Sequence, residues 1–401
     1  MTLPPACVSI FFTINSCFHE DFMTKTSLGI VTTQFFTCFG HPEFLELKSG
    51  QKLGPITIAY ETYGELNAQK SNAVLICHAL TGDAHAAGYH KGDDKPGWWD
   101  MMIGPGKAFD TEKYFVICAN VLGGCKGTTG PSSINPETGK PYGLSFPVIT
   151  IKDMVLVQQK LVAHLGITKL LNVAGGSMGG LQVMKWAVLF PKMVHSATII
   201  ATNYRHNAQQ IALHEVGRQA IMSDPDWNGG DYYGKAAPKQ GLALARMIGH
   251  ITYMSEKSMD EKFGRKLIDK EKLGYDFSAD FQVQNYLRYR GDSFVDRFDA
   301  NSYLYITKAV DYFDLEEEAG NLKSALQDVR SKFLVISFSS DWLYPAHQLE
   351  TFIQALKASD QDVTNVVIDS DYGHDAFLIE QKNQTHVVSH YLKRMAKEVN
   401  L

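Results

Sequence analysis

The sequence predicts an α/β fold, in which a mostly parallel central sheet is covered by helices on both faces. Several short apolar runs rich in β-branched residues are typical of buried parallel strands. They are Ala73–Cys77, Tyr114–Ala119, Leu170–Ala174, Ala197–Ala201, Phe333–Phe338 and Val363–Ile368. Between two of them, apolar residues recur at helical spacing over Ile151–Leu165. Strands that alternate with helices in this way indicate a parallel sheet.

The middle of the chain has a different pattern. From about Tyr204 to about Leu322 the signals are mainly helical or loop-like, as in GLALARMIGHITYMSEK, and strand-like runs are scarce until Phe333. We therefore expect one core domain made of residues 42–204 and 323–401, with a helical cap domain of residues 205–322 inserted into it. Residues 1–22 are expected to form a poorly ordered N-terminal extension.

Composition excludes several classes of function. The 401 residues include 38 Lys and Arg against 43 Asp and Glu, a net charge of −5, so no basic surface for nucleic acid is expected. No apolar run reaches the roughly 18 residues of a membrane-spanning helix. The short stretch VSIFFTI follows no positively charged segment, which disfavours a secretory signal and leaves an upstream start before Met23 as an alternative. The six cysteines form no C-x-x-C pair, which favours a reducing cytoplasm.

A candidate nucleophile lies at Ser177. The run AGGSMGG carries the pattern G-x-S-x-G at Gly175, Ser177 and Gly179, after an apolar strand and before the helical segment LQVMKWAVLF. This strand–turn–helix setting is typical of a nucleophile elbow, in which small neighbours permit a strained turn. The following helix would place the backbone N–H of Met178 where it can stabilise an oxyanion.

A serine nucleophile needs a base, and the base needs a carboxylate that orients it. Asp341 follows the strand Phe333–Phe338, and His374 follows the strand Val363–Ile368. The order Ser, Asp, His is the order of an elbow-type hydrolase. The competing candidates are Asp369, Asp371 and His347, which are expected to serve as loop or helix residues.

The segment HALTGDAH contains His78 and His85, with His90 beyond it. It lacks the H-E-x-x-H spacing of a zinc helix and has no Cys/His box, so we expect no metal. Its position after the strand Ala73–Cys77 suits a second oxyanion donor, through a backbone N–H near Leu80.

Longer motifs resemble the homoserine O-acetyltransferases of the α/β-hydrolase superfamily. The segments that carry the resemblance are ITIAYETYGELN, CHALTGDAHAAG, PGWWD, NVLGGCKGTTGPSSINP, AGGSMGGLQVMKWA, GLALARMIGHITY, SFVDRFDANSYLYITKA, SDWLYP and GHDAF. They span about residues 42–395. Residues 1–22 have no counterpart in the pattern.

The resemblance implies an α/β-hydrolase fold and the transfer of an acetyl group from acetyl-CoA to L-homoserine in methionine synthesis, without a permanent cofactor. It places the family's triad on Ser177, Asp341 and His374, and substrate contacts on Arg246 and Asp375. It also implies a homodimer built through the cap helices. Alternatives that stay open are a succinyl donor, serine as acceptor, and a serine esterase of the same fold.

Overall fold

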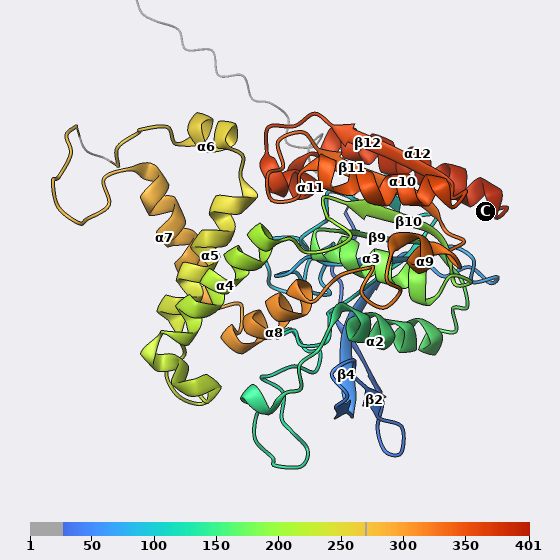
Figure 1. Cartoon of the computed structure of the whole chain (residues 1–401), viewed down its shortest axis with the longest axis horizontal. Coiled ribbons are helices and arrows are strands. Elements are labelled where there is room, and N and C mark those ends of the chain that lie inside the picture. The colour runs from blue at the N-terminus through green and yellow to red at the C-terminus, as the bar shows by residue number, and fades with distance from the viewer. Residues whose placement is uncertain (1–26, 269–270) are drawn as a thin grey trace, which may run out of the picture.

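A sheet of eight strands forms the centre of the computed structural model, which describes residues 27–268 and 271–401 (Figure 1). The extension predicted for residues 1–22 lies outside the described residues. In spatial order the strands are β1 (Gln34–Cys38), β4 (Ile56–Tyr63), β8 (Phe115–Ala119), β5 (Ala73–Cys77), β9 (Leu170–Gly176), β10 (Val194–Ile200), β11 (Lys332–Phe338) and β12 (Val363–Ile368).

Every strand predicted from an apolar run is present and lies in the parallel part of the sheet, from β8 to β12. The strands that sequence patterns did not identify, β1 and β4, are antiparallel and occupy one side of the sheet. Polar residues such as Thr57, Glu61 and Thr62 interrupt β4, so it does not read as a continuous apolar run.

Helices cover both faces of the sheet. On one face, strand residues such as Leu75 and Val173 share a core with the helices α2 (Ile151–His164), α3 (Met178–Leu189), α9 (Leu322–Leu326) and α10 (Glu350–Ala358). On the other face, Val74 and Ile76 share a core with α11 (Ala376–Ile379) and α12 (Gln381–Glu398). Neighbouring strand residues thus face opposite cores, which explains why these strands are apolar throughout. Full burial of each such side chain contributes about 1.5–3 kcal/mol.

A group of helices lies between β10 and β11 in the sequence and beside the sheet in space (Figure 1). Its members are α4 (Ala208–Met222), α5 (Lys239–Tyr253), α6 (Glu256–Lys262), α7 (Gln282–Val295) and α8 (Ala300–Asp311). The central helix α5 packs against both α4 and α7. Within the described part of this stretch no residue joins the central sheet, as the helical pattern predicted, whereas the limits of a separate cap domain stay a prediction.

Short elements complete the fold. Two small ribbons pair β2 (Leu45–Glu46) with β3 (Lys52–Leu53), and β6 (Ile103–Gly104) with β7 (Phe109–Asp110). Single 3-10 turns are η1 (Gly143–Ser145), η2 (Pro225–Gly230), η3 (Ala346–Leu349) and η4 (Gly373–Asp375). Of the helices in residues 27–268 and 271–401, none has the length and apolar character needed to cross a bilayer.

The topology gathers particular loops at one edge of the sheet. The segments that follow β5, β9, β11 and β12 all leave the carboxyl ends of parallel strands. Such ends meet at one edge, which is where ligand sites of parallel sheets form. These segments contain Leu80, Ser177, Asp341 and His374.

Candidate active site

Ser177 occupies a strained turn between β9 and α3. Its backbone has φ 55° and ψ −125°, a conformation that residues with a side chain rarely adopt. The chain passes close to its neighbours here: a Cβ on Gly179 would lie 2.1 Å from the carbonyl oxygen of Cys77, and one on Gly180 would lie 2.5 Å from Thr202 Cγ2. Glycine at both positions lets the turn form, so the hydroxyl projects at the edge of the sheet.

The structure brings Ser177, His374 and Asp341 together in one chain of contacts. His374 Nε2 lies 2.9 Å from Ser177 Oγ, and His374 Nδ1 lies 2.8 Å from Asp341 Oδ2. The side chains of His374 and Asp341 are almost completely buried. Residues separated by up to 197 positions thus meet in the geometry of a nucleophile, its base and the carboxylate that orients the base.

Neighbouring groups fix this arrangement. The second oxygen of Asp341 accepts hydrogen bonds from the backbone N–H groups of Leu343 at 3.0 Å and Tyr344 at 2.8 Å. The His374 ring lies against the rings of Tyr344 and Phe377, with centroids 5.1 and 5.5 Å away. Packing against these two rings, together with the contact to Asp341, restricts rotation of the imidazole.

The competing residues make other contacts. Asp369 accepts a hydrogen bond from Ser339 Oγ at 2.7 Å, and Asp371 pairs with Lys257 at 2.6 Å. His347 lies in the turn η3, where it belongs to the start of a helical segment. Of the carboxylates weighed for His374, Asp341 is the one that contacts its ring.

A small cavity lies in front of the serine. It has a volume of about 50 Å³, and Leu80, Ser177 and Met178 line it together with Tyr253 and Tyr344. Met178 is the first residue of α3, so its N–H is at the positive end of that helix. Both predicted oxyanion donors therefore border the space in which an acyl carbonyl would lie beside Ser177.

Arg246 and Asp375 approach the same region from α5 and η4. Arg246 Nη1 donates to Thr81 Oγ1 at 3.4 Å, and its guanidinium lies 5.6 Å from the centroid of the Tyr253 ring. Burial raises the pKa of Asp375, while the neighbouring side chains of His374 and Arg246 oppose the rise. The positive charge of Arg246 thus acts on the carboxyl of Asp375.

Sequence reasoning gave no role to the tyrosines of this region. Tyr253 follows Arg246 by two helical turns, and burial raises the pKa of its hydroxyl. Tyr344 interacts with Ser177, and its hydroxyl lies 2.7 Å from His206 Nε2. Both tyrosines lie in motifs quoted above, GLALARMIGHITY and SDWLYP, but only the folded chain places them at the serine.

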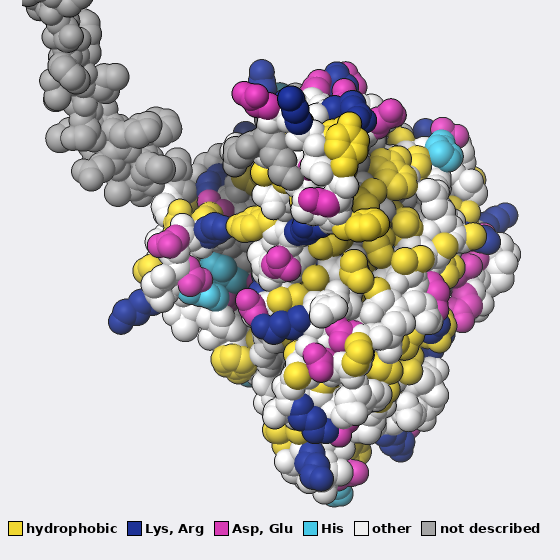
Figure 2. Space-filling view, turned by 90° about the vertical axis from the view of Figure 1, so that its left-hand side faces the viewer, with side chains coloured by type: hydrophobic (Ala, Val, Ile, Leu, Met, Phe, Trp, Pro, Cys, Tyr) yellow, Lys and Arg dark blue, Asp and Glu magenta, His cyan; other side chains and the backbone are white. Residues whose placement is uncertain are grey.

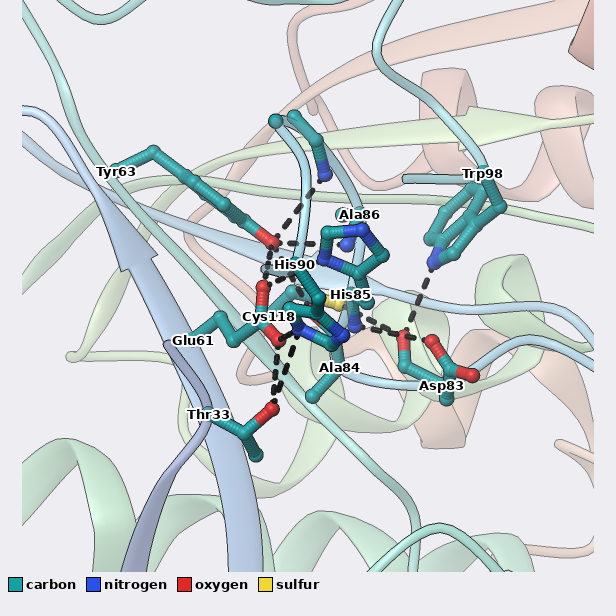
Figure 3. Close-up of polar contacts among 12 residues, drawn as sticks. Thr33, Glu61, Tyr63, Asp83, Ala84, His85, Ala86, His90, Trp98 and Cys118 are labelled. Carbon is teal, nitrogen blue, oxygen red and sulfur yellow. Dashed lines mark hydrogen bonds and ion pairs between the residues drawn. The ribbon is translucent and has the colours of Figure 1, made fainter. Parts of the chain in front are cut away.

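The histidines after β5 divide into two groups. His78 is buried and structural: its Nε2 accepts the backbone N–H of Val121 at 3.0 Å, and its Nδ1 donates to the Ala79 carbonyl at 2.7 Å. His85 and His90 instead reach Glu61 on β4 (Figure 3). Glu61 was not identified from the sequence, although a charged residue within a largely apolar strand was a signal that could have drawn attention.

Glu61 is completely buried and accepts several hydrogen bonds. Burial alone would raise its pKa, but the hydrogen bonds from His85, His90, Thr33 and Tyr63 outweigh burial and lower the pKa to about 2. The carboxylate therefore stays ionised at neutral pH.

Comparisons with known proteins agree with the geometry. A family model described as alpha/beta hydrolase fold matches residues 72–381. The homoserine O-acetyltransferase of Methanohalobium evestigatum is 60% identical over 370 residues, which cover 92% of this chain and 75% of that protein. A crystal structure of homoserine O-acetyltransferase from Bacillus anthracis is 32% identical with a TM-score of 0.85, covering 90% of this chain and 98% of that one. Esterase E22 is 33% identical with a TM-score of 0.82, covering 90% of this chain and all of its own.

Proposed function

The chain belongs to the homoserine O-acetyltransferase family of the α/β-hydrolase fold, and on that premise we propose that Ser177 carries the acetyl group between two substrates. The donor is acetyl-CoA and the acceptor is the hydroxyl of L-homoserine, so the product is an activated precursor for methionine synthesis. The observation that carries the proposal is the contact of 2.9 Å between Ser177 Oγ and His374 Nε2.

In the first half of the cycle, Ser177 Oγ attacks the thioester carbonyl while its proton passes to His374 Nε2. The backbone N–H groups of Met178 and Leu80 hold the oxyanion that forms, and each such donor typically contributes about 3 kcal/mol. The carbon–sulfur bond then breaks, and the thiolate of coenzyme A leaves with the proton from His374. Asp341 stabilises the intermediate imidazolium through its contact with Nδ1.

In the second half, His374 takes the proton of the homoserine hydroxyl as that oxygen attacks the acetyl-serine. Collapse of the intermediate returns the proton to Ser177 and releases O-acetylhomoserine. Each half reaction uses the same base and the same oxyanion donors. The cycle needs no permanently bound cofactor.

Arg246 and Asp375 are proposed to orient homoserine. A guanidinium fork suits the substrate carboxylate, and a carboxylate suits its ammonium group. Homoserine would then be favoured over water because it is positioned, not because its hydroxyl is a better nucleophile.

Replacing Arg246 with Lys should lower kcat/KM for homoserine by about 10–100-fold, because a hydrogen bond to a charged group contributes free energy of that size. The rate of acetylation of Ser177 should stay unchanged, as should all rates of the surface control Arg205→Lys.

Ester hydrolysis is a second candidate, and the similarity to esterase E22 is the observation that favours it. Thiol release should be measured with acetyl-CoA or succinyl-CoA, each with homoserine, serine or no acceptor. We expect fast sustained release for acetyl-CoA with homoserine and a slow background without an acceptor. Equal sustained rates with and without homoserine would identify a hydrolase, and a preference for succinyl-CoA or serine would replace the proposed substrates.

We also propose that two copies pair through the helices beside the sheet. Hydrophobic side chains gather on this side of the molecule (Figure 2). They include exposed Leu244 and Ile251 of α5, and an apolar groove of about 730 Å³ that Met254, Met259 and Phe263 help to line. Contiguous apolar surface of this kind typically marks an interface. The cytoplasm remains the compartment in which we expect the enzyme to act.

A further inference from the structure

A second cluster of reactive side chains lies outside the serine site, where β4 faces the loop that follows β5 (Figure 3). Its centre is the carboxylate of Glu61, which is completely buried. His85 Nδ1 lies 3.0 Å from Oε2 of this carboxylate, and His90 Nε2 lies 2.7 Å from Oε1. Each imidazole therefore faces a different oxygen of the same group.

The arrangement brings three metal-ligating groups together. The two imidazole rings stack with centroids 3.8 Å apart, and one nitrogen of each lies within hydrogen-bond distance of a carboxylate oxygen. One ligand atom from each of the three residues lies within 4.8 Å of the others. Zinc binds nitrogen and oxygen ligands at about 2.0–2.2 Å, so an ion bound to these atoms would replace the imidazole protons and move the nitrogens slightly away from the carboxylate oxygens. Two imidazoles with one carboxylate is a donor set that suits divalent transition metals.

Outer contacts support this donor set. Thr33 Oγ1 donates to Oε1 of Glu61 at 2.8 Å, and the hydroxyl of Tyr63 donates to Oε2 at 2.9 Å. On the far side of the His90 ring, Nδ1 lies 3.8 Å from the carboxylate of Asp93. Hydroxyls that hold a metal ligand in this way fix its direction, and the negative charge of Asp93 favours His90 as a ligand electrostatically.

An ion could reach the cluster from solvent. A cavity of about 380 Å³ is lined by Glu61, His85 and His90, and also by Asp83 and Asp93. The side chain of Asp93 is 56% exposed, so a carboxylate stands at the entrance. Lys126 lines the cavity as well, so the carboxylates of the cavity outnumber its one lysine and favour a cation.

The other histidine cluster of the described residues is a poorer candidate. His206, His214 and Asp311 also lie within 4.8 Å of one another. The guanidinium of Arg218 lies 2.7 Å from Asp311, however, and neutralises the carboxylate that a cation would need. At the Glu61 cluster, no lysine or arginine pairs with the carboxylate in the contacts of the described chain.

We propose that Glu61, His85 and His90 bind one divalent transition-metal ion, with a structural role. The ion would tie the loop that carries Leu80 to β4, apart from the triad. Without metal, the same atoms form a hydrogen-bonded clamp between these two segments.

Metal-stripped full-length protein should be titrated with ZnCl2 by calorimetry, and its zinc content measured after desalting. The test variant is His90→Gln, which keeps a hydrogen-bond donor toward Glu61 but loses the imidazole. The control is His390→Gln, which breaks the exposed pair of His386 and His390 on α12, with centroids 4.1 Å apart. Asp93→Asn serves as a second variant, with a smaller expected loss of zinc affinity. Circular dichroism checks that each variant is folded.

We expect the wild type to bind about one zinc ion per chain, with protons released because bound imidazoles must be deprotonated. His90→Gln should lower the affinity by about 100-fold or more and Asp93→Asn by about 10-fold, whereas His390→Gln should leave it unchanged. Cobalt added in place of zinc should give visible absorption bands that His90→Gln abolishes. Zinc binding that is absent in the wild type, unaffected by both His90→Gln and Asp93→Asn, or lost in His390→Gln would overturn the proposal.

Discussion

Each side chain of the proposed relay depends on a neighbour that fixes its direction. Asp341 is held by two backbone N–H groups, and His374 is held by Asp341 and by the rings of Tyr344 and Phe377. Such preorganisation lets a proton move without a preceding rotation of the imidazole. The sequence identified Ser177, Asp341 and His374 because each follows an apolar strand in a fixed order. It gave no role to Tyr344, whose importance arises from contacts between distant segments, and Glu61 was missed although its charge within a largely apolar strand was a signal.

The carboxylate of the relay should matter far more than its neighbours in sequence. Asp341→Asn keeps the size of the side chain but favours the wrong tautomer of His374, so we expect kcat for acetyl transfer to fall by about 10⁴-fold. Asp369→Asn is the control, because Asp369 bonds to Ser339 instead of His374. Steady-state release of coenzyme A thiol measures kcat for both variants. A similar loss in the two variants would mean that Asp341 has no special role.

A buried histidine near the site should make stability depend on pH. Burial lowers the pKa of His206 from 6.5 to about 4, so the folded protein keeps this ring neutral where the unfolded chain takes up a proton. The contribution of neutral His206 to stability is complete above pH 6.5 and is lost as the pH falls toward 4. This loss is a change of about 3 kcal/mol in the free energy of unfolding.

Urea unfolding at several pH values between 4 and 7 measures this dependence. His206→Asn should have a shallower decline in unfolding free energy than the wild type, although its stability at pH 7 will be lower. The control variant His390→Asn, at an exposed position, should show the same slope of unfolding free energy against pH as the wild type. Equal slopes for His206→Asn and the wild type would contradict the assignment.

At the scale of single elements, the elbow between β9 and α3 is tightly constrained, by a strained serine and by glycines that lie close to neighbouring residues. The sequence predicted it from a strand, a glycine-rich turn and a helix in succession, because each has a local signature. The parallel strands were predictable for the same reason: burial on both faces requires a continuous apolar run. In contrast, β1 and β4 combine polar and apolar residues, and their pairing with the sheet is set by contacts across the fold.

The close approach at the elbow predicts that a methyl group added at Gly179 lowers stability, whereas one added at an open glycine does not. Gly179→Ala would place a Cβ 2.1 Å from the Cys77 carbonyl, so β5 and α3 must separate. We expect a loss of about 1–3 kcal/mol in stability, together with reduced activity as Ser177 shifts. Gly40→Ala has open space around the new Cβ and should change stability by less than about 0.5 kcal/mol. Thermal unfolding distinguishes the two, and equal melting temperatures would show that the turn is not tight.

At the scale of the whole molecule, the parallel sheet is what assembles the site. The strands β5, β9, β11 and β12 bring the residues that we propose as oxyanion donor, nucleophile, carboxylate and base to one edge. The helices beside the sheet add Arg246 from α5 and, in our proposal, orient the acceptor. The parallel character of the sheet was predictable, whereas the packing of α5 beside the triad was not, because helical periodicity does not tell which loop a helix will face.

The central claim is that the acetyl group passes through a covalent bond to Ser177, and trapping that intermediate tests it most directly. The protein should be mixed rapidly with acetyl-CoA alone, quenched with acid, digested and analysed by mass spectrometry, with Ser177→Ala as the control. We predict a burst of about one thiol per chain and an acetyl group on the peptide that contains Ser177. No burst and no acetylated peptide unless homoserine is also present would contradict the account and indicate direct transfer between the two substrates.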